Sequence, residues 1–123
     1  MKEFFQSPVP TDYLRDESRT SGTADAIAFP RDTAELSAAV REAAARGLPV
    51  TIQGARTGIS AGAVPAGGAV VNLSKMERIL GLRTDAAGRA VLRAQPGVPL
   101  VALRRYLSAD GRSPMADCSP APT

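Results

Sequence analysis

The clearest pattern of apolar and polar positions in the chain predicts a helix that starts after Asp32. Apolar side chains recur three or four residues apart, the spacing of one helix face, at Leu36, Ala39, Val40, Ala43 and Ala44. Asp32 and Glu35 have the spacing of a capping box, and Gly47 suits the position just beyond the last turn. We therefore expect an amphipathic helix here, with its apolar face packed on a core.

Short apolar runs on both sides of this helix predict strands. They lie at residues 26–29, 48–53 and 68–73. Two later runs, at 79–84 and 89–94, flank the turn sequence Asp85-Ala86-Ala87-Gly88 and are typical of a hairpin. Before the first strand, Tyr13 and Leu14 indicate one short helical turn.

A second helix is predicted after the hairpin. Pro99 fits its first turn, where the missing N–H costs nothing, and Gly111 fits its end. The residues expected to face inward are Leu100, Leu103 and Leu107, with Tyr106 beside them. Beyond Gly111, three prolines among small polar residues predict irregular structure.

This order of elements predicts an α/β (α+β) fold, a small mixed sheet flanked by helices. We expect residues 1–28 to be a lead-in that contains the start of the first strand. Residues 29–111 are expected to form the main subdomain, and residues 112–123 a proline-rich connecting loop that the chain leaves incomplete. At 123 residues the chain can bury one modest core.

Composition narrows the classes of function. The chain has no histidine, which removes the commonest general base and metal ligand, and its single cysteine cannot form an internal disulfide. A net charge of +3 raises the question of nucleic acid, but the arginines are scattered among acids and lack an aromatic platform. No stretch has the length of a signal sequence or a membrane span, so we expect a cytoplasmic protein.

The stretch with the most chemical information is the loop that follows the second predicted strand. Five glycines fall between Gly54 and Gly68, and no acidic residue occurs from Ala43 through Met76. Glycine lets backbone N–H groups approach a ligand without a Cβ in the way, and successive inward N–H groups form a nest for an anion. A phosphate group is the ligand that this pattern suits, although an ordinary surface loop has the same composition.

Familiar phosphate motifs do not account for this loop. Gly62 is followed by Ala63 and Val64, so the P-loop sequence is absent, and so is the G-x-G-x-x-G turn. Thr57 and Ser60 are expected to act as hydrogen-bond donors, because no histidine is present to activate either as a nucleophile.

The chain resembles the first part of the FAD-binding (PCMH-type) domain of the vanillyl-alcohol-oxidase/para-cresol-methylhydroxylase flavoproteins. It is most similar to the glycolate oxidase FAD subunit and the FAD-linked D-lactate dehydrogenases. The segments that carry the resemblance are Phe29-Pro30, the helix from Asp32, Gly47-Leu48-Pro49-Val50, the loop 54–65, Asn72-Leu73-Ser74-Lys75-Met76, Ile79-Leu80 and Ala94-Gln95-Pro96-Gly97-Val98. They follow the family's order and spacing.

The resemblance implies that backbone N–H groups of the loop hold the diphosphate of FAD. The cofactor-binding residues that it implies are Gln53, Gly54, Ala55, Arg56, Thr57, Gly58, Ile59, Ser60, Ala61 and Gly62. Arg56 occupies a site that is often glycine in relatives, so its side chain either pairs with phosphate or points to solvent, and we favour solvent. Asn72 and Leu73 are expected to be sheet residues.

The resemblance further implies a partial FAD-dependent oxidoreductase of the 2-hydroxy-acid type, inactive alone and weak in binding FAD. Its expected partners are FAD, a missing second FAD subdomain or substrate domain, and a second copy of the chain, because half a cofactor domain leaves apolar surface uncovered. The alternative is a non-catalytic nucleotide-binding or self-associating α/β module. No catalytic residue and no metal ligand are assigned.

Overall fold

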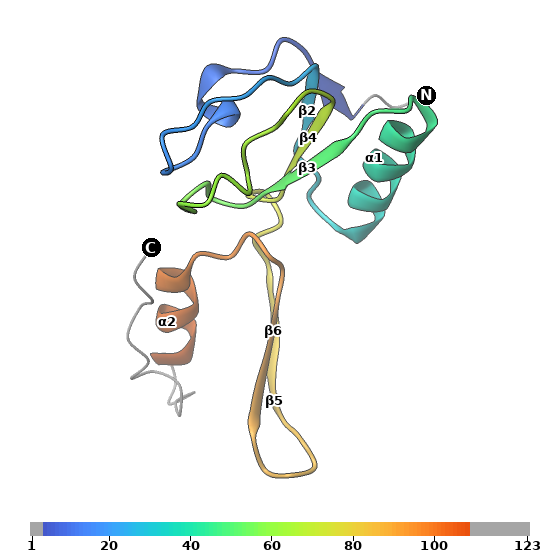
Figure 1. Cartoon of the computed structure of the whole chain (residues 1–123). Helices are drawn as coiled ribbons and strands as arrows, with labels where there is room; N and C mark the ends of the chain where they lie inside the picture. Colours follow the sequence, from blue (N-terminus) through green and yellow to red (C-terminus); the bar gives the residue numbers. More distant parts are fainter. Residues whose placement is uncertain (1–3, 109–123) are drawn as a thin grey trace. The chain divides into compact units, whose positions relative to one another are not determined.

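The computed structural model describes residues 4–108, in which helices and strands are joined by loops (Figure 1). The elements are β1 (Phe5–Gln6), the 3-10 helix η1 (Thr11–Leu14), β2 (Ala26–Ala28), α1 (Thr33–Ala45), β3 (Val50–Gln53), β4 (Ala69–Asn72), β5 (Ile79–Thr84), β6 (Ala90–Ala94) and α2 (Leu100–Ser108). They divide into two compact units, one ending at Met76 and the other beginning at Glu77.

The first unit is built on a four-stranded mixed sheet in the order β1-β2-β4-β3. β2, β4 and β3 run parallel, with Ile27 opposite Val70 and Ile52 opposite Val71, and β1 adds an antiparallel edge. All four residues of β4 are buried, so both faces of this central strand are covered. The mixed α/β class expected from the sequence is confirmed, but the sequence pattern did not reveal β1.

Helix α1 begins and ends as the sequence predicts. The Asp32 carboxylate accepts the N–H of Glu35 at 2.8 Å. Glu35 reaches back to the N–H of Arg31, one residue earlier than a capping box requires. At the other end Gly47, with φ of +68°, donates to Ala44, and the next N–H donates to Ala43, the two bonds of a Schellman motif.

The predicted apolar face of α1 is only partly buried. Ala39 and Ala43 are fully buried beside the sheet, but Val40 is 39% exposed and Ala44 is also exposed. β3 is an edge strand, so it offers no neighbour on its outer side, and its Ile52 is 48% exposed. The prediction that all five residues of the face pack inward is therefore wrong for two of them.

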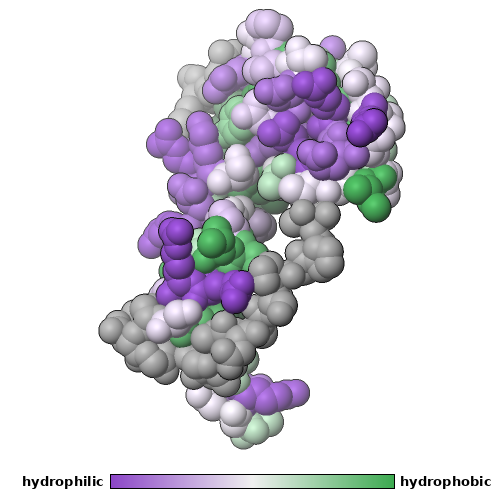
Figure 2. Space-filling model, turned by 90° about the vertical axis from the view of Figure 1, so that its left-hand side faces the viewer, coloured by the Kyte–Doolittle hydropathy of each residue, from purple (hydrophilic) through white to green (hydrophobic). Residues whose placement is uncertain are grey.

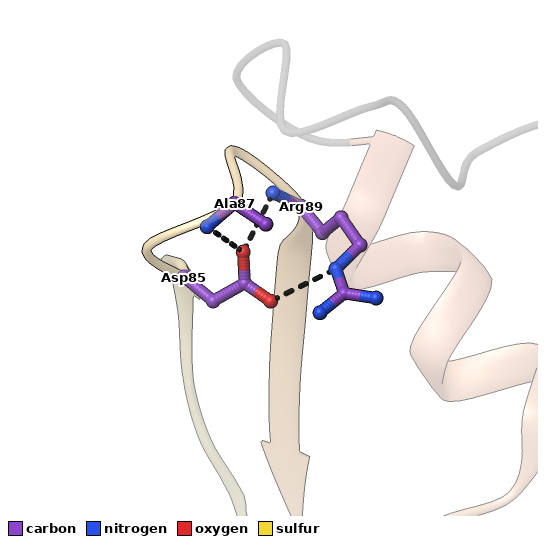
Figure 3. A network of polar contacts seen from close by, with 3 residues as sticks. All are labelled: Asp85, Ala87 and Arg89. Carbon is purple, nitrogen blue, oxygen red and sulfur yellow. Dashed lines mark hydrogen bonds and ion pairs between the residues drawn. The ribbon is translucent and has the colours of Figure 1, made fainter.

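The second unit contains the expected hairpin and the expected second helix. The Asp85 carboxylate closes the turn of the hairpin (Figure 3). It accepts the N–H groups of Ala87 and Arg89, each at 2.9 Å, and forms an ion pair with the Arg89 guanidinium at 3.1 Å. These bonds, led by the Arg89 N–H, hold the pKa of Asp85 below its ordinary value of 3.8. In α2 Leu107 is buried as predicted, but Leu100 is 38% exposed. The predicted end at Gly111 and the loop 112–123 lie outside the described residues.

Candidate functional site

The predicted cofactor loop connects two parallel neighbours, β3 and β4. It starts after Gln53 and ends before Ala69. Parallel strands need a long connection, because the chain must return along the sheet, and a helix usually makes that return. Here the connection contains no helix or strand. The loop is thus both the crossover of the sheet and the candidate ligand site.

A buried amide pair anchors the start of the loop. Gln53 is 1% exposed, and its Nε2 donates to the carbonyls of Tyr13 at 2.6 Å and Ala63 at 2.9 Å. Its Oε1 accepts from Asn72 at 3.0 Å, while the Asn72 Oδ1 accepts the N–H of Ser74. The Gln53 side chain therefore ties strand, loop and N-terminal segment together. Asn72 has the sheet role expected for it.

The N-terminal segment 11–25 contacts the loop and supports it, a role that the sequence did not suggest. Thr23 donates to the carbonyl of Pro65 at 3.0 Å and accepts from Gly67 at 2.7 Å. Gly22 lies so close that an added Cβ would stand 1.9 Å from the Pro65 oxygen, and no side chain fits there. Figure 1 shows this segment and the loop on the same side of the sheet. The residues expected to be a lead-in are part of the loop's support.

The backbone N–H groups differ between the two parts of the loop: those of Val64, Gly67 and Gly68 donate hydrogen bonds, whereas those of the first ten residues donate to no described residue. Among residues 4–108, none of the N–H groups from Gly54 to Ala63 donates a hydrogen bond. Most of this stretch is exposed, with Ile59 at 78%. These exposed N–H groups are donors that water or an anion can reach, and an anion nest is built from such successive backbone donors.

Backbone conformation explains two of the five glycines of the loop, because Gly67 and Gly68 have φ of +83° and +73°. Positive φ values occur at Arg56 (+61°) and Ala61 (+63°), whereas Gly54, Gly58 and Gly62 lie outside the left-handed region. Glycine therefore supplies the positive φ at the end of the loop but not between Gly54 and Gly62. A Cβ on Gly54 would meet nothing within 4 Å. Neither conformation nor packing requires glycine there, and its bare backbone would allow close approach of a ligand.

In the structure the Arg56 side chain lies against the N-terminal segment. The guanidinium lies 4.7 Å from the ring centre of Tyr13 and donates to the carbonyl of Asp12. Tyr13 in turn packs edge-on against Phe29 at 5.3 Å. Arg56 thus folds back onto the N-terminal segment and fastens the loop to it.

Acidic side chains adjoin the loop in space, although none occurs near it in sequence. A pocket of about 220 Å³ is lined by Asp12, Arg15, Asp16, Glu17, Ala55 and Arg56. The first unit is mostly hydrophilic on the face shown in Figure 2. Within residues 4–108, no three acidic or cysteine side chains are placed to hold a metal ion. In the same range, no helix combines the length and apolar character that a bilayer crossing needs.

Comparison with known proteins identifies the class of ligand. A model of the family described as "FAD binding domain" matches residues 24–122. The chain belongs to this FAD-binding family. The match includes the whole loop, both strands that carry it and helix α1. FAD is therefore the cofactor of the domain.

Two relatives show how much of a longer protein this region represents. A D-lactate dehydrogenase of Anaerostipes hadrus is 37% identical over 92 residues, which are 72% of this chain and 19% of the relative. An uncharacterised FAD-linked oxidoreductase of Mycobacterium tuberculosis is 34% identical over 101 residues, 77% of this chain and 21% of the relative. The chain therefore spans about a fifth of the length of the curated relatives that it matches.

The loop fits the diphosphate of FAD. Its N–H groups supply donors, its glycines leave their backbone accessible, and the hydroxyls of Thr57 and Ser60 are exposed without partners among the described residues. The Gln53 side chain is already satisfied by three hydrogen bonds, so the predicted part of Gln53 in binding rests on its backbone. The assignment of individual residues from Gln53 to Gly62 to the cofactor remains a prediction.

Proposed function

We propose that the loop from Gln53 to Gly62 holds the FAD diphosphate, and that the chain is the cofactor-binding part of an FAD-dependent oxidoreductase of 2-hydroxy acids. The observation that supports the first part is the run of N–H groups from Gly54 to Ala63 that donate to no described residue, in a stretch where neither conformation nor packing requires glycine at Gly54, Gly58 or Gly62. The similarity to the D-lactate dehydrogenase of Anaerostipes hadrus supports D-lactate or a similar acid as the substrate.

In this proposal the residues of the chain bind and orient, and they take no part in proton transfer. Bound FAD supplies the hydride acceptor, while backbone donors neutralise its diphosphate. Gln53 and Arg56 act indirectly, because their side chains fix the loop on the segment that contains Tyr13. Residues that accept the substrate's hydroxyl proton belong to regions beyond this chain.

A ligand series tests the diphosphate assignment. We expect the chain to bind FAD and ADP with similar affinity, weaker than micromolar, and to ignore riboflavin, which has the flavin ring but no phosphate. Fluorescence titration measures flavin binding, and competition measures ADP. Riboflavin binding as tight as FAD binding would contradict the diphosphate assignment. Submicromolar FAD affinity or dehydrogenase activity of the isolated chain would contradict the proposal that the chain is only part of the enzyme.

A further inference from the structure

Asp16 has a buried carboxylate, and one of its two oxygens has no hydrogen-bond partner among the described residues. The residue is 8% exposed and sits in a tight turn of the N-terminal segment. Its Oδ1 accepts the N–H of Ser18 at 2.8 Å, and its carbonyl accepts the N–H of Arg19 at 3.2 Å. Its Oδ2 is buried and has no partner among the described residues. Native proteins rarely leave a buried carboxylate oxygen without a donor, because its desolvation is costly.

The unpartnered oxygen lies near Gly58, in the loop between β3 and β4. Asp16 Oδ2 lies 4.0 Å from the position that a Cβ on Gly58 would occupy. The N–H groups of Gly58 and Ile59 are among those that donate to nothing within the described residues. The pocket lined by Asp16, Ala55 and Arg56 separates this turn from the start of the loop. An acceptor without a donor therefore lies near a stretch of the loop whose N–H groups donate to no described residue.

We propose that Asp16 is a positioning residue for the cofactor loop: its Oδ2 accepts the N–H of Gly58 or Ile59 when the loop closes on a diphosphate. The inference rests on the proposed function of the loop. A hydrogen bond to a carboxylate is among the stronger ones in proteins, so a single bond can set the loop's conformation. The bond also accounts for glycine at position 58, since a side chain there would stand between the backbone and Asp16.

If Asp16 acted only by repelling an anionic ligand, its replacement would change the affinity in the opposite direction. If Asp16 were only a buried charge near the loop, replacing it with neutral Asn would tighten the binding of an anionic ligand. If Oδ2 is an acceptor, Asp16→Asn sets an N–H₂ group against a backbone N–H and weakens binding. The sign of the change in affinity therefore separates the two roles.

The experiment uses the full 123-residue chain with inorganic pyrophosphate and with FAD as separate probes. We expect Asp16→Asn to raise the Kd for both about 10-fold or more. Asp12→Asn is the matched control, because that side chain is 73% exposed, lines the same pocket and pairs with Arg15, and it is expected to change Kd by less than about twofold. Unchanged or tighter binding in Asp16→Asn overturns the proposal. Weaker binding of FAD alone also overturns it, since it indicates contact with a ligand hydroxyl.

Two further measurements exclude a merely structural effect. In wild-type chain saturated with pyrophosphate, the amide proton of Gly58 or Ile59 should move downfield in an NMR spectrum, and in Asp16→Asn it should not. Gly58→Ala should raise the Kd as Asp16→Asn does, and the double variant should bind no more weakly than either single variant. The effects of Gly54→Ala and Asp16→Asn on the free energy of binding should instead be additive. Additivity of the Asp16–Gly58 pair contradicts the proposal even if one variant is poorly folded.

Hydrogen exchange of the free chain separates this inference from the proposed function. Asp16→Asn should speed exchange at Gly58 and Ile59 relative to Asp12→Asn, because the closed loop is sampled without ligand. A wild-type chain that binds neither probe but shows this dependence refutes the FAD assignment alone. Binding of both probes without dependence on Asp16 refutes the positioning role alone.

Discussion

Gly54→Ala is expected to stabilise the fold and weaken FAD binding at the same time. Gly54 lies outside the left-handed region, and an added Cβ meets nothing within 4 Å. Alanine is therefore compatible with the native backbone and reduces the entropy of the unfolded chain, a gain of about 0.4–1 kcal/mol. For a unit of this size the gain corresponds to a rise in Tm of roughly 2–8 °C.

The effect on binding has the opposite sign because the same Cβ occupies the space through which a diphosphate reaches the backbone. Losing one or two hydrogen bonds to a charged ligand corresponds to roughly 1.5–3 kcal/mol, or a Kd raised about 10- to 100-fold. Thermal melts followed by circular dichroism measure stability, and titration with ADP measures affinity. Gly62→Ala should behave alike, since its Cβ would only touch Ser60 at 3.9 Å.

Gly47→Ala is the matched control, because it changes glycine to alanine at a site with φ of +68° that closes α1 and lies outside the loop. It should lower stability by about 1 kcal/mol and leave ADP affinity unchanged. Loop variants that gain stability and keep full affinity would refute the inference that close ligand approach explains these glycines. Loop variants that lose stability would refute the assignment of their backbone conformation.

Three other changes test the surrounding structure. Gln53→Ala should cost about 2–4 kcal/mol in urea unfolding because it leaves buried carbonyls unpaired, and a double-mutant cycle with Asn72→Ala should show coupling of at least about 0.5 kcal/mol. Gly22→Ala should destabilise by about 2–4 kcal/mol, since its Cβ meets the Pro65 carbonyl, and a melt matching wild type would contradict this contact. Asp85 has a lowered pKa, so its contribution to stability is present above pH 3.8 and is lost as pH falls through its folded pKa; the difference in Tm between wild type and Asp85→Asn should shrink below that pH.

Local patterns predicted the regular elements well. Asp32, Gly47 and the hairpin turn act through neighbours in sequence, and each does in the structure what its local chemistry requires. Burial along α1 was predicted less well, because helical spacing does not tell which residues extend past the edge of a sheet. Val40, for example, is 39% exposed although the neighbouring Ala39 is fully buried.

The support of the site could not be predicted in the same way. The contact between Gln53 and Tyr13 spans 40 positions, and that between Arg56 and Asp12 spans 44. No local pattern encodes such pairings. Asp16 carries a weak signal, because Asp followed two residues later by Ser is typical of a side-chain-closed turn, but the turn alone does not show that its second oxygen lies against the loop.

The connection between β3 and β4 is longer than its path along the sheet requires. It contains the 15 residues between Gln53 and Ala69, enough to extend about 50 Å, while the return along a four-residue strand needs only about 13 Å. Its two ends are fixed by strand pairing, so small insertions or deletions in between can alter the outline of the ligand site without shifting the register of the strands. Variation in cofactor affinity among such domains can therefore arise in this span at little cost to folding.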